Sequence, residues 1–140
     1  MLRLCSVPNY GPNGAAENIE LDPSCGLLSV ALLNARSIIN KIDLFPLFVT
    51  NYNVNILLVS ETWLRECYPN SLLGLDCDFV IYRKDRSGEC GGGVCAIISK
   101  TLNSVMVDIP AEFSRIELVC FDVFISDAKY RFIVLSSALL

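Results

Sequence analysis

Two polar residues follow apolar segments of the chain and are its best candidates for chemistry. Glu61 comes directly after the apolar residues 55–60, and Asn34 comes directly after the apolar residues 27–33. A carboxylate at the end of a strand can hold a hard divalent ion such as Mg²⁺, and an amide there can orient a metal ligand or hydrogen-bond a phosphate oxygen. Each also has a plainer interpretation, Glu61 as an exposed glutamate and Asn34 as the residue that turns the chain out of its strand.

The other polar motifs favour turns. Residues 91–93 are three glycines, but a phosphate-binding loop would continue through Gly-Lys-Ser/Thr into a helix, whereas the strand-like Val94 follows here. Asp76, Asp78 and Asp85 lack the spacing of metal ligands and are expected at solvated loop positions.

The chain has 7 cysteines and no histidine. An odd number of cysteines without an export signal is not typical of a disulfide framework, and without histidine or a Cys-x-x-Cys pair we expect no zinc site. Cys95 and Cys120 lie in apolar segments and are interpreted as buried thiols of an intracellular protein, nuclear or cytoplasmic, in a reducing compartment. The absence of histidine also excludes a His-dependent catalytic triad in this chain.

Composition indicates one globular domain. The 140 residues are 53% hydrophobic and 19% charged, which excludes a disordered chain. No apolar run approaches the roughly 18 residues of a membrane-spanning helix, so no membrane partner is expected. A net charge of −4 argues against nucleic-acid binding by the whole surface. The dense basic group Arg83, Lys84 and Arg86 is either a solvated turn or a phosphate contact.

The segments around the two candidate residues predict a β-α-β unit. Residues 27–33 and 55–60 are short apolar runs, as in strands that are buried on both faces. Between them we predict a helix that begins after Asp43, whose side chain would cap the first turn, with Pro46 inside that turn. The predicted packing face of this helix consists of Leu44, Leu47, Phe48 and Tyr52.

This unit determines where the candidate residues should lie. The two strands of a β-α-β unit are parallel, and their carboxyl ends meet at one edge of the sheet. Asn34 and Glu61 are therefore expected at the edge where open α/β sheets bind their ligands.

The remaining chain predicts a leader and several strands. Residues 1–26 are rich in proline and glycine and are interpreted as a flexible leader before a folded domain at 27–140. The segments predicted as strands are 78–83 and 94–99, which form a hairpin, and 105–109, 116–125 and 130–135, with a tight turn at 127–129. A β-α-β start followed by many strands indicates an α+β fold or a layered α/β sandwich.

The chain resembles a known family in an ordered set of motifs. These are LLNARSIINKID (32–43), ILLVSETWL (56–64), YRKDRSGECGGGVCAII (82–98) and IELVCFDVFI (116–125). They are similar to the amino-terminal half of the endonuclease domain of non-LTR (LINE-type) retrotransposons, in the exonuclease–endonuclease–phosphatase superfamily. The resemblance extends from about residue 27 to residue 135.

The resemblance implies a fold and an activity. The fold is a four-layer α/β sandwich of two packed sheets with helices outside, and the activity is Mg²⁺-dependent cleavage of a DNA phosphodiester. Glu61 corresponds to the metal-binding glutamate, and Asn34 to the active-site asparagine. Arg83 and Arg86 match basic positions expected to contact DNA. The full-length element would also carry a reverse-transcriptase region.

The chain also departs from the family pattern. Where the family continues into a Tyr-Arg-Pro-Pro-like segment, residues 136–138 are Ser-Ser-Ala, and the later Asp, Asn and His motifs of the family do not follow. We therefore expect a truncated sandwich with exposed apolar strands. Three hypotheses remain: an incomplete nuclease domain with little or no turnover, an active domain whose sequence is cut short, or a non-catalytic binding module that uses the exposed sheet.

Overall fold

The apolar segments that precede the two candidate residues form neighbouring strands of one sheet. The computed structural model describes residues 2–6, 28–88 and 90–136. Strands β2 (Leu28–Asn34) and β3 (Ile56–Ser60) pair in parallel, with Asn34 opposite Ser60. Helix α1 (Leu44–Asn51) lies between them in the chain. The predicted β-α-β unit is therefore confirmed.

Three further strands complete this larger sheet, whose order is β1-β2-β3-β5-β4. Strands β4 (Phe79–Lys84) and β5 (Val94–Ser99) form the expected antiparallel hairpin, and β5 also pairs with β3. Strand β1 (Leu2–Ser6) pairs in parallel with β2.

Strand β1 corrects the interpretation of residues 1–26 as a leader without regular structure. Five residues are too few to show a clear hydrophobic period, so only the pairing with β2 identifies this strand. Residues 1 and 7–26 lie outside the described part of the chain, and a folded domain that begins at residue 27 stays a prediction.

The smaller sheet has the order β6-β7-β8. It consists of β6 (Asn103–Met106), β7 (Leu118–Ile125) and β8 (Ala128–Leu135), all antiparallel to their neighbours. The turn between β7 and β8 contains only residues 126 and 127, one position before the predicted turn. Strand β6 begins two residues before its predicted segment and ends three residues before that segment's end.

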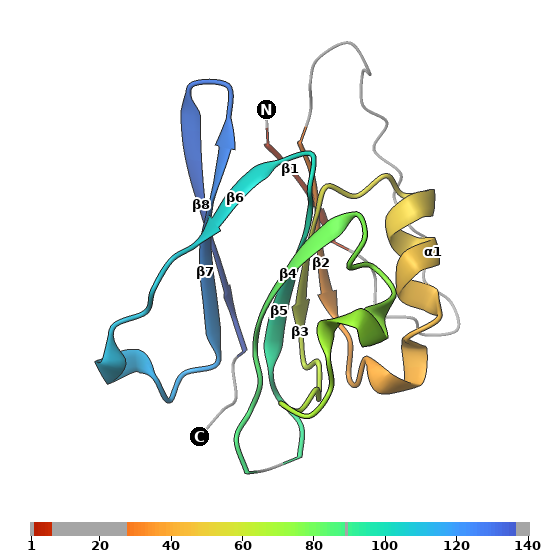
Figure 1. The fold of residues 1–140 in the computed structure, drawn as a ribbon, viewed down its shortest axis with the longest axis vertical. Coiled ribbons are helices and arrows are strands. Elements are labelled where there is room, and N and C mark those ends of the chain that lie inside the picture. Colours follow the sequence, from red (N-terminus) through yellow and green to blue (C-terminus); the bar gives the residue numbers. More distant parts are fainter. Residues whose placement is uncertain (1, 7–27, 89, 137–140) are drawn as a thin grey trace.

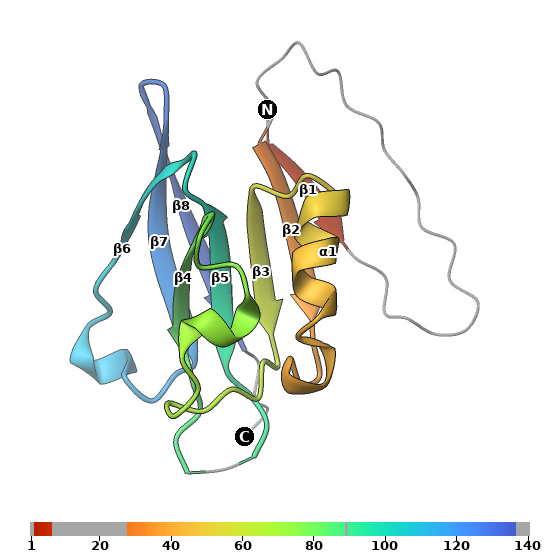
Figure 2. The same ribbon diagram turned by 45° about the vertical axis from the view of Figure 1, so that its right-hand side comes forward.

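The two sheets pack face to face, and α1 covers the other face of the larger sheet (Figures 1 and 2). Between the sheets, Val30 and Ile56 belong to one buried cluster with Phe121 and Phe132, whose stacked rings have centroids 5.2 Å apart. The opposite face of the larger sheet packs against α1. Burial of central strands on both faces explains the high apolar content of the chain.

Helix α1 turns a different face to the sheet from the one predicted. Phe45 and Val49 are each 3% exposed, whereas Leu44 and Leu47 are 59% and 58% exposed. The helix is apolar on nearly every side, so its spacing fits two faces, and tertiary packing selects the one with Phe45 and Val49, one turn apart. Tyr52, also on the predicted face, is exposed. Of the four residues of that face, only Phe48 is partly buried.

The predicted cap of α1 is absent as well. The Asp43 side chain makes no capping hydrogen bond, because a 3₁₀ turn (Ile39–Lys41) leads directly into the helix. The Ile42 carbonyl accepts from the Phe45 N–H at 3.2 Å. A backbone carbonyl therefore satisfies a donor that a side-chain cap would otherwise serve.

These layers confirm the predicted α/β sandwich in partial form. Three of the four expected layers are present, namely α1 and the two sheets. Within residues 28–88 and 90–136 no helix covers the outer face of the smaller sheet; the remaining helical turns are the short 3₁₀ segments Asn70–Leu73 and Ala111–Phe113. None of the described helices has the length and apolar character needed to cross a bilayer.

Candidate active site

The segment after β3 is held in an unusual backbone conformation. Glu61 and Trp63 both have a φ of +55°, and Arg36 and Ser37, which follow β2, also have positive φ values. The two segments remain paired beyond the strands, because the Ser37 N–H donates to the Glu61 carbonyl at 2.9 Å. Non-glycine residues in this conformation are strained and are found preferentially at functional sites.

The Glu61 carboxylate accepts three hydrogen bonds. Trp63 Nε1–H donates to Oε2 at 3.0 Å, the Gly92 N–H donates to Oε2 at 3.2 Å, and Ser136 Oγ–H donates to Oε1 at 3.1 Å. The indole hydrogen bond is the largest influence on the Glu61 pKa. Together with the Gly92 and Ser136 bonds and the charge of Arg86, it outweighs burial and lowers that pKa. Glu61 is therefore ionised at neutral pH.

The triple-glycine segment forms one wall of the site. It is a turn, as predicted, and the backbone N–H groups of Gly92 and Gly93 donate hydrogen bonds to carboxylate side chains. The Gly92 and Gly93 carbonyls accept from Trp63 N–H at 2.9 Å and Thr62 N–H at 3.2 Å. Gly92 has a φ of +68°, and a Cβ there would lie 2.4 Å from the Arg86 guanidinium, so a larger residue would be strained and would displace the Arg86 side chain.

A second carboxylate lies next to this loop. Glu117, the residue before β7, is 9% exposed. Its Oε2 accepts from the Gly93 N–H at 2.8 Å, and its Oε1 accepts from Arg86 Nε–H in an ion pair. Burial opposes ionisation of Glu117, but the Arg86, Gly93 and Ser136 interactions together outweigh it and lower its pKa.

Asn34 lies at the same edge of the sheet as Glu61, as predicted. It is exposed at the end of β2, and the next N–H along the chain, that of Ala35, donates to the Ser60 carbonyl at 2.9 Å. The roles assigned to Asn34 and Glu61 from the family resemblance stay predictions.

The arginines expected to contact DNA both form ion pairs within the protein. Arg83 pairs with Asp85 at 3.0 Å and donates to the Arg65 carbonyl, also at 3.0 Å, and its side chain is only 13% exposed. Arg86 pairs with Glu117. Contact with DNA by Arg83 and Arg86 therefore stays a prediction, and both residues also have a structural role.

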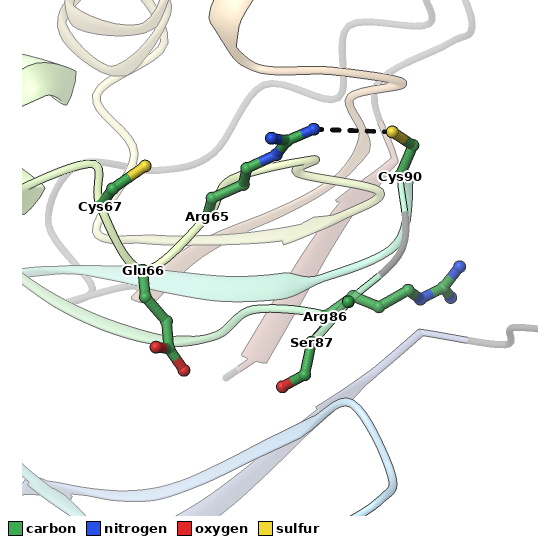
Figure 3. A pocket seen from close by; sticks show the side chains of 7 residues that line it. Arg65, Glu66, Cys67, Arg86, Ser87 and Cys90 are labelled. Atoms are coloured by element: carbon green, nitrogen blue, oxygen red, sulfur yellow. Dashed lines mark hydrogen bonds between the residues drawn. The ribbon is translucent and has the colours of Figure 1, made fainter.

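An open pocket of about 520 Å³ lies beside the glycine loop (Figure 3). Arg65, from the segment after Trp63, reaches across it and donates to Cys90 Sγ at 3.6 Å. Arg86 lines the same pocket. The pocket is thus lined by two arginines, of which Arg65 is exposed and Arg86 is paired with Glu117.

The donor set fits a magnesium ion that has a single carboxylate ligand from the protein. An ionised carboxylate has about four acceptor positions, and three on Glu61 are taken. Within the described part of the chain, no three His, Cys, Asp or Glu side chains are grouped to hold a metal. The residues therefore fit an ion bound through one protein carboxylate, with waters and a substrate phosphate supplying the other ligands, as is usual for Mg²⁺.

The cysteines agree with their predicted positions. Cys95 and Cys120 are buried, whereas Cys67, Cys77 and Cys90 are exposed, and all five are free thiols. Burial raises the pKa of Cys95 to about 12. Cys95 is therefore a protonated core residue and has no part in the candidate site.

Comparisons with known proteins identify the fold. No protein-family model matches the sequence, and no curated protein sequence matches it. Among solved structures, the endonuclease domain of TRAS1, a telomere-specific non-LTR retrotransposon, superposes with a TM-score of 0.54 over 77% of this chain, at 10% identity. A humanized D. rerio TDP2 superposes with a TM-score of 0.51 over 76%, at 16% identity. The chain therefore shares its fold with part of each of these two structures.

The match covers only part of each solved structure. The chain spans 43% of the TRAS1 domain and 48% of the humanized TDP2 chain. D. rerio TDP2 complexed with a single-strand DNA product matches with a TM-score of 0.50, at 15% identity, over 76% of this chain and 44% of that one. The predicted resemblance to a retrotransposon endonuclease domain is confirmed at the level of fold, over part of that domain.

Sequence reasoning missed two residues of the candidate site. Glu117 and Ser136 flank strands β7 and β8 of the smaller sheet, while Glu61 ends a strand of the larger sheet. The only sequence signal for Glu117 is an acid directly before a buried apolar run. Ser136 gives no such signal, because its contact with Glu61 depends on how the two sheets pack.

Proposed function

We propose that this chain is the amino-terminal part of a Mg²⁺-dependent DNA endonuclease-type phosphodiesterase of retrotransposon origin, with weak or no turnover by itself. The observation that supports the proposal is the position of an exposed amide, Asn34, and an ionised carboxylate, Glu61, at one edge of a parallel strand pair. Edges of this kind are where open α/β sheets bind ligands.

In this proposal Glu61 is the protein's metal ligand. Its remaining acceptor position would bind the ion, while Trp63, Gly92 and Ser136 hold the carboxylate by hydrogen bonds. The bound Mg²⁺ would stabilise negative charge on the phosphoryl oxygens during in-line attack by water. Asn34 would hydrogen-bond a phosphate oxygen or a water and so orient the phosphodiester.

Weak turnover follows from the groups that could accept a proton. The chain has no histidine, and the buried carboxylate nearest the loop, Glu117, is committed to Arg86 and Gly93. A phosphodiesterase needs a group that activates the water. We therefore expect this chain to bind Mg²⁺ and DNA but to cleave DNA slowly or not at all.

DNA is the proposed partner. The pocket beside the site contains Arg65 and Arg86, and guanidinium groups suit contacts with phosphate. Arg83 and Arg86 stay proposed DNA contacts, with the ion pairs described above as their structural role. A reverse-transcriptase region in the full-length element is part of the same proposal.

Metal binding is the first test. Mn²⁺, as an EPR-detectable substitute for Mg²⁺, is titrated into the protein with a short single-stranded oligonucleotide present. We expect Glu61→Gln to abolish binding, because it removes the charged ligand, whereas Glu112→Gln, at an exposed residue outside the pocket, leaves it unchanged. Equal Mn²⁺ affinity in the wild type and in Glu61→Gln would contradict the proposal.

Nicking of supercoiled plasmid in Mg²⁺ tests turnover. We expect little nicking above a control without metal. Efficient nicking that Glu61→Ala abolishes would support the metal site and contradict weak turnover.

The second candidate function is a non-catalytic binding module that uses the smaller sheet. The observation that favours it is the exposure of apolar residues on this sheet, among them Ile133 at 59% and Leu135 at 53%. A stoichiometric partner complex that forms equally well with Glu61→Ala would support this function over the metal site.

A further inference from the structure

Glu117 is a buried carboxylate that carries a charge. A buried carboxylate is costly unless it is paired and hydrogen-bonded, and both oxygens of Glu117 have partners, Arg86 on one and the Gly93 N–H on the other. A buried ion pair adds little net stability compared with apolar residues of similar size. Stability is therefore a weak reason for this arrangement.

The position of Glu117 supplies a better reason. Two successive amides of the glycine loop diverge to two carboxylates: Gly92 N–H donates to Glu61, and Gly93 N–H donates to Glu117. The loop has little freedom to shift between them. A Cβ on Gly93 would lie 2.5 Å from Thr62 Oγ1, and the Arg86 guanidinium lies against Gly92.

Ser136 joins the same two carboxylate residues from the other side. Its N–H donates to the Glu117 carbonyl at 3.0 Å, and its hydroxyl donates to Glu61 Oε1 at 3.1 Å. Glu117 thus contacts Ser136, which donates to Glu61, and also contacts Gly93 and Arg86, which lie next to Gly92. These contacts link the end of the larger sheet with the smaller sheet.

We propose that Glu117 is a positioning residue for Glu61. Its side chain fixes Arg86 and Gly93, and its backbone carbonyl holds the Ser136 N–H, so that the Gly92 N–H and the Ser136 hydroxyl remain directed at the Glu61 carboxylate. The hydrogen-bond arrangement stands without the proposed metal function, and only the expected effect on metal affinity rests on that function.

Glu117→Gln tests the proposal with little change of shape. A carboxylate accepts on both oxygens, whereas a glutamine amide accepts on one side and presents N–H on the other, toward either Arg86 or the Gly93 N–H. The loop must then move. The matched control is Glu112→Gln, at an exposed residue of the same connecting segment.

The first measurement is a ¹H–¹⁵N NMR spectrum without metal. Two signals report on Glu61: the Gly92 amide and the indole N–H of Trp63, the only tryptophan in the chain. We expect both signals to shift in Glu117→Gln and neither to shift in Glu112→Gln. Both signals unchanged in Glu117→Gln would overturn the proposal, even if the melting temperature fell, because a purely stabilising residue would have that effect.

The second measurement is Mn²⁺ affinity by EPR. Partners of metal ligands typically change affinity by about 10-fold to 100-fold when they are mutated, and we expect a weakening of this size in Glu117→Gln and none in Glu112→Gln. If Glu61→Gln no longer binds Mn²⁺ but Glu117→Gln binds it as tightly as the wild type, Glu117 does not position Glu61 for metal binding. Unchanged affinity in Glu61→Gln would instead contradict the proposed function, while the NMR result would still decide positioning.

A second variant covers the case in which Glu117→Gln does not fold. Arg86→Lys keeps the positive charge but loses the Nε–H that Glu117 accepts. We expect the same two NMR signals to shift. Their constancy in a folded Arg86→Lys protein would overturn the proposal.

Discussion

Glu61 obtains its orientation at a cost in backbone strain. A non-glycine residue in the left-handed region is less stable by on the order of 1–3 kcal/mol, and Glu61 and Trp63 both occupy it. The hydrogen bonds from Thr62 and Trp63 N–H to the glycine loop hold the segment there. The indole of Trp63 then reaches back to the Glu61 carboxylate.

Gly93 gives a test of this packing at a single residue. Gly93 and Gly88 have similar φ values, +81° and +84°, but a Cβ on Gly93 would meet Thr62 Oγ1, whereas one on Gly88 would meet nothing within 4 Å. Both alanine variants should lose about 1–2 kcal/mol of unfolding free energy from the left-handed conformation. Gly93→Ala should lose a further 1–3 kcal/mol, roughly, from overpacking.

Urea denaturation of both variants and the wild type checks this prediction. Equal losses in Gly93→Ala and Gly88→Ala would show that the contact with Thr62 is unimportant.

At the residue level, sequence predicts the parts of the site that depend on one element. Asn34 and Glu61 each end an apolar strand, and parallel pairing alone brings them to one edge. Glu117 and Ser136 could not be predicted, because they belong to the other sheet and no local pattern reports how two sheets pack. Ser136 is even the first residue where the chain departs from the family pattern, yet it donates to the candidate metal ligand.

At the level of elements, α1 shows why a short apolar helix is ambiguous. Strands β2, β3, β4, β5, β7 and β8 follow from apolar runs and turn residues, and the structure confirms them. For α1, hydrophobic spacing fits both the face with Leu44 and Leu47 and the face with Phe45 and Val49. Contact with the sheet decides between them, and this contact is not a local property of the helix.

The buried face of α1 predicts unequal effects of two alanine substitutions. Phe45→Ala should reduce the free energy of unfolding by about 3–5 kcal/mol, because it leaves a cavity against the sheet. Leu47→Ala, on the same helix but exposed, should change it by less than about 0.5 kcal/mol. Chemical denaturation measures both changes. A larger loss for Leu47→Ala would contradict the observed face.

The β7–β8 hairpin predicts a dependence of stability on pH. Asp122 lies opposite Arg131 and accepts from its guanidinium at 2.7 and 2.9 Å, with Lys129 3.6 Å away. The hydrogen bonds from Arg131, with the charges of Arg131 and Lys129, outweigh burial and lower the Asp122 pKa. The unfolded chain, with an Asp pKa of about 3.9, therefore binds a proton more readily than the folded protein does.

It follows that the contribution of Asp122 to stability is present above about pH 4 and is lost as the pH falls through the lower, folded pKa. Urea denaturation between pH 6 and pH 2.5 should show a shallower decline for Asp122→Asn than for the wild type. The same decline in both would show that other carboxylates, such as Glu61 and Glu117, account for the acid sensitivity.

At the scale of the whole molecule, the smaller sheet has two different faces. Phe121, Phe132 and Val134 of its inner face are buried between the sheets. On the outer face, Val105, Ile133 and Leu135 are 52%, 59% and 53% exposed. Exposed apolar sheet surfaces promote association, as the sequence led us to expect.

Ile133→Lys should reduce this association. A lysine on the outer face makes sheet-to-sheet contact unfavourable, and the native side chain is too exposed to contribute much to the core. Light scattering over a concentration series should show a smaller apparent mass than for the wild type. Leu47→Lys, at an equally exposed position on α1, is the control, and an equal effect of both variants would argue against a specific role of this sheet.

The hydrogen bond between Ser136 and Glu61 joins residues 75 positions apart. A nascent chain leaving the ribosome can pair β2 with β3 early, yet the carboxylate lacks this donor until β8 has been translated and docked. Contacts of such long sequence separation form late, because a large loop must close first. A ribosome that stalls, or a protease that removes the chain from residue 136 onward, would therefore leave Glu61 without the hydrogen bond that Ser136 donates.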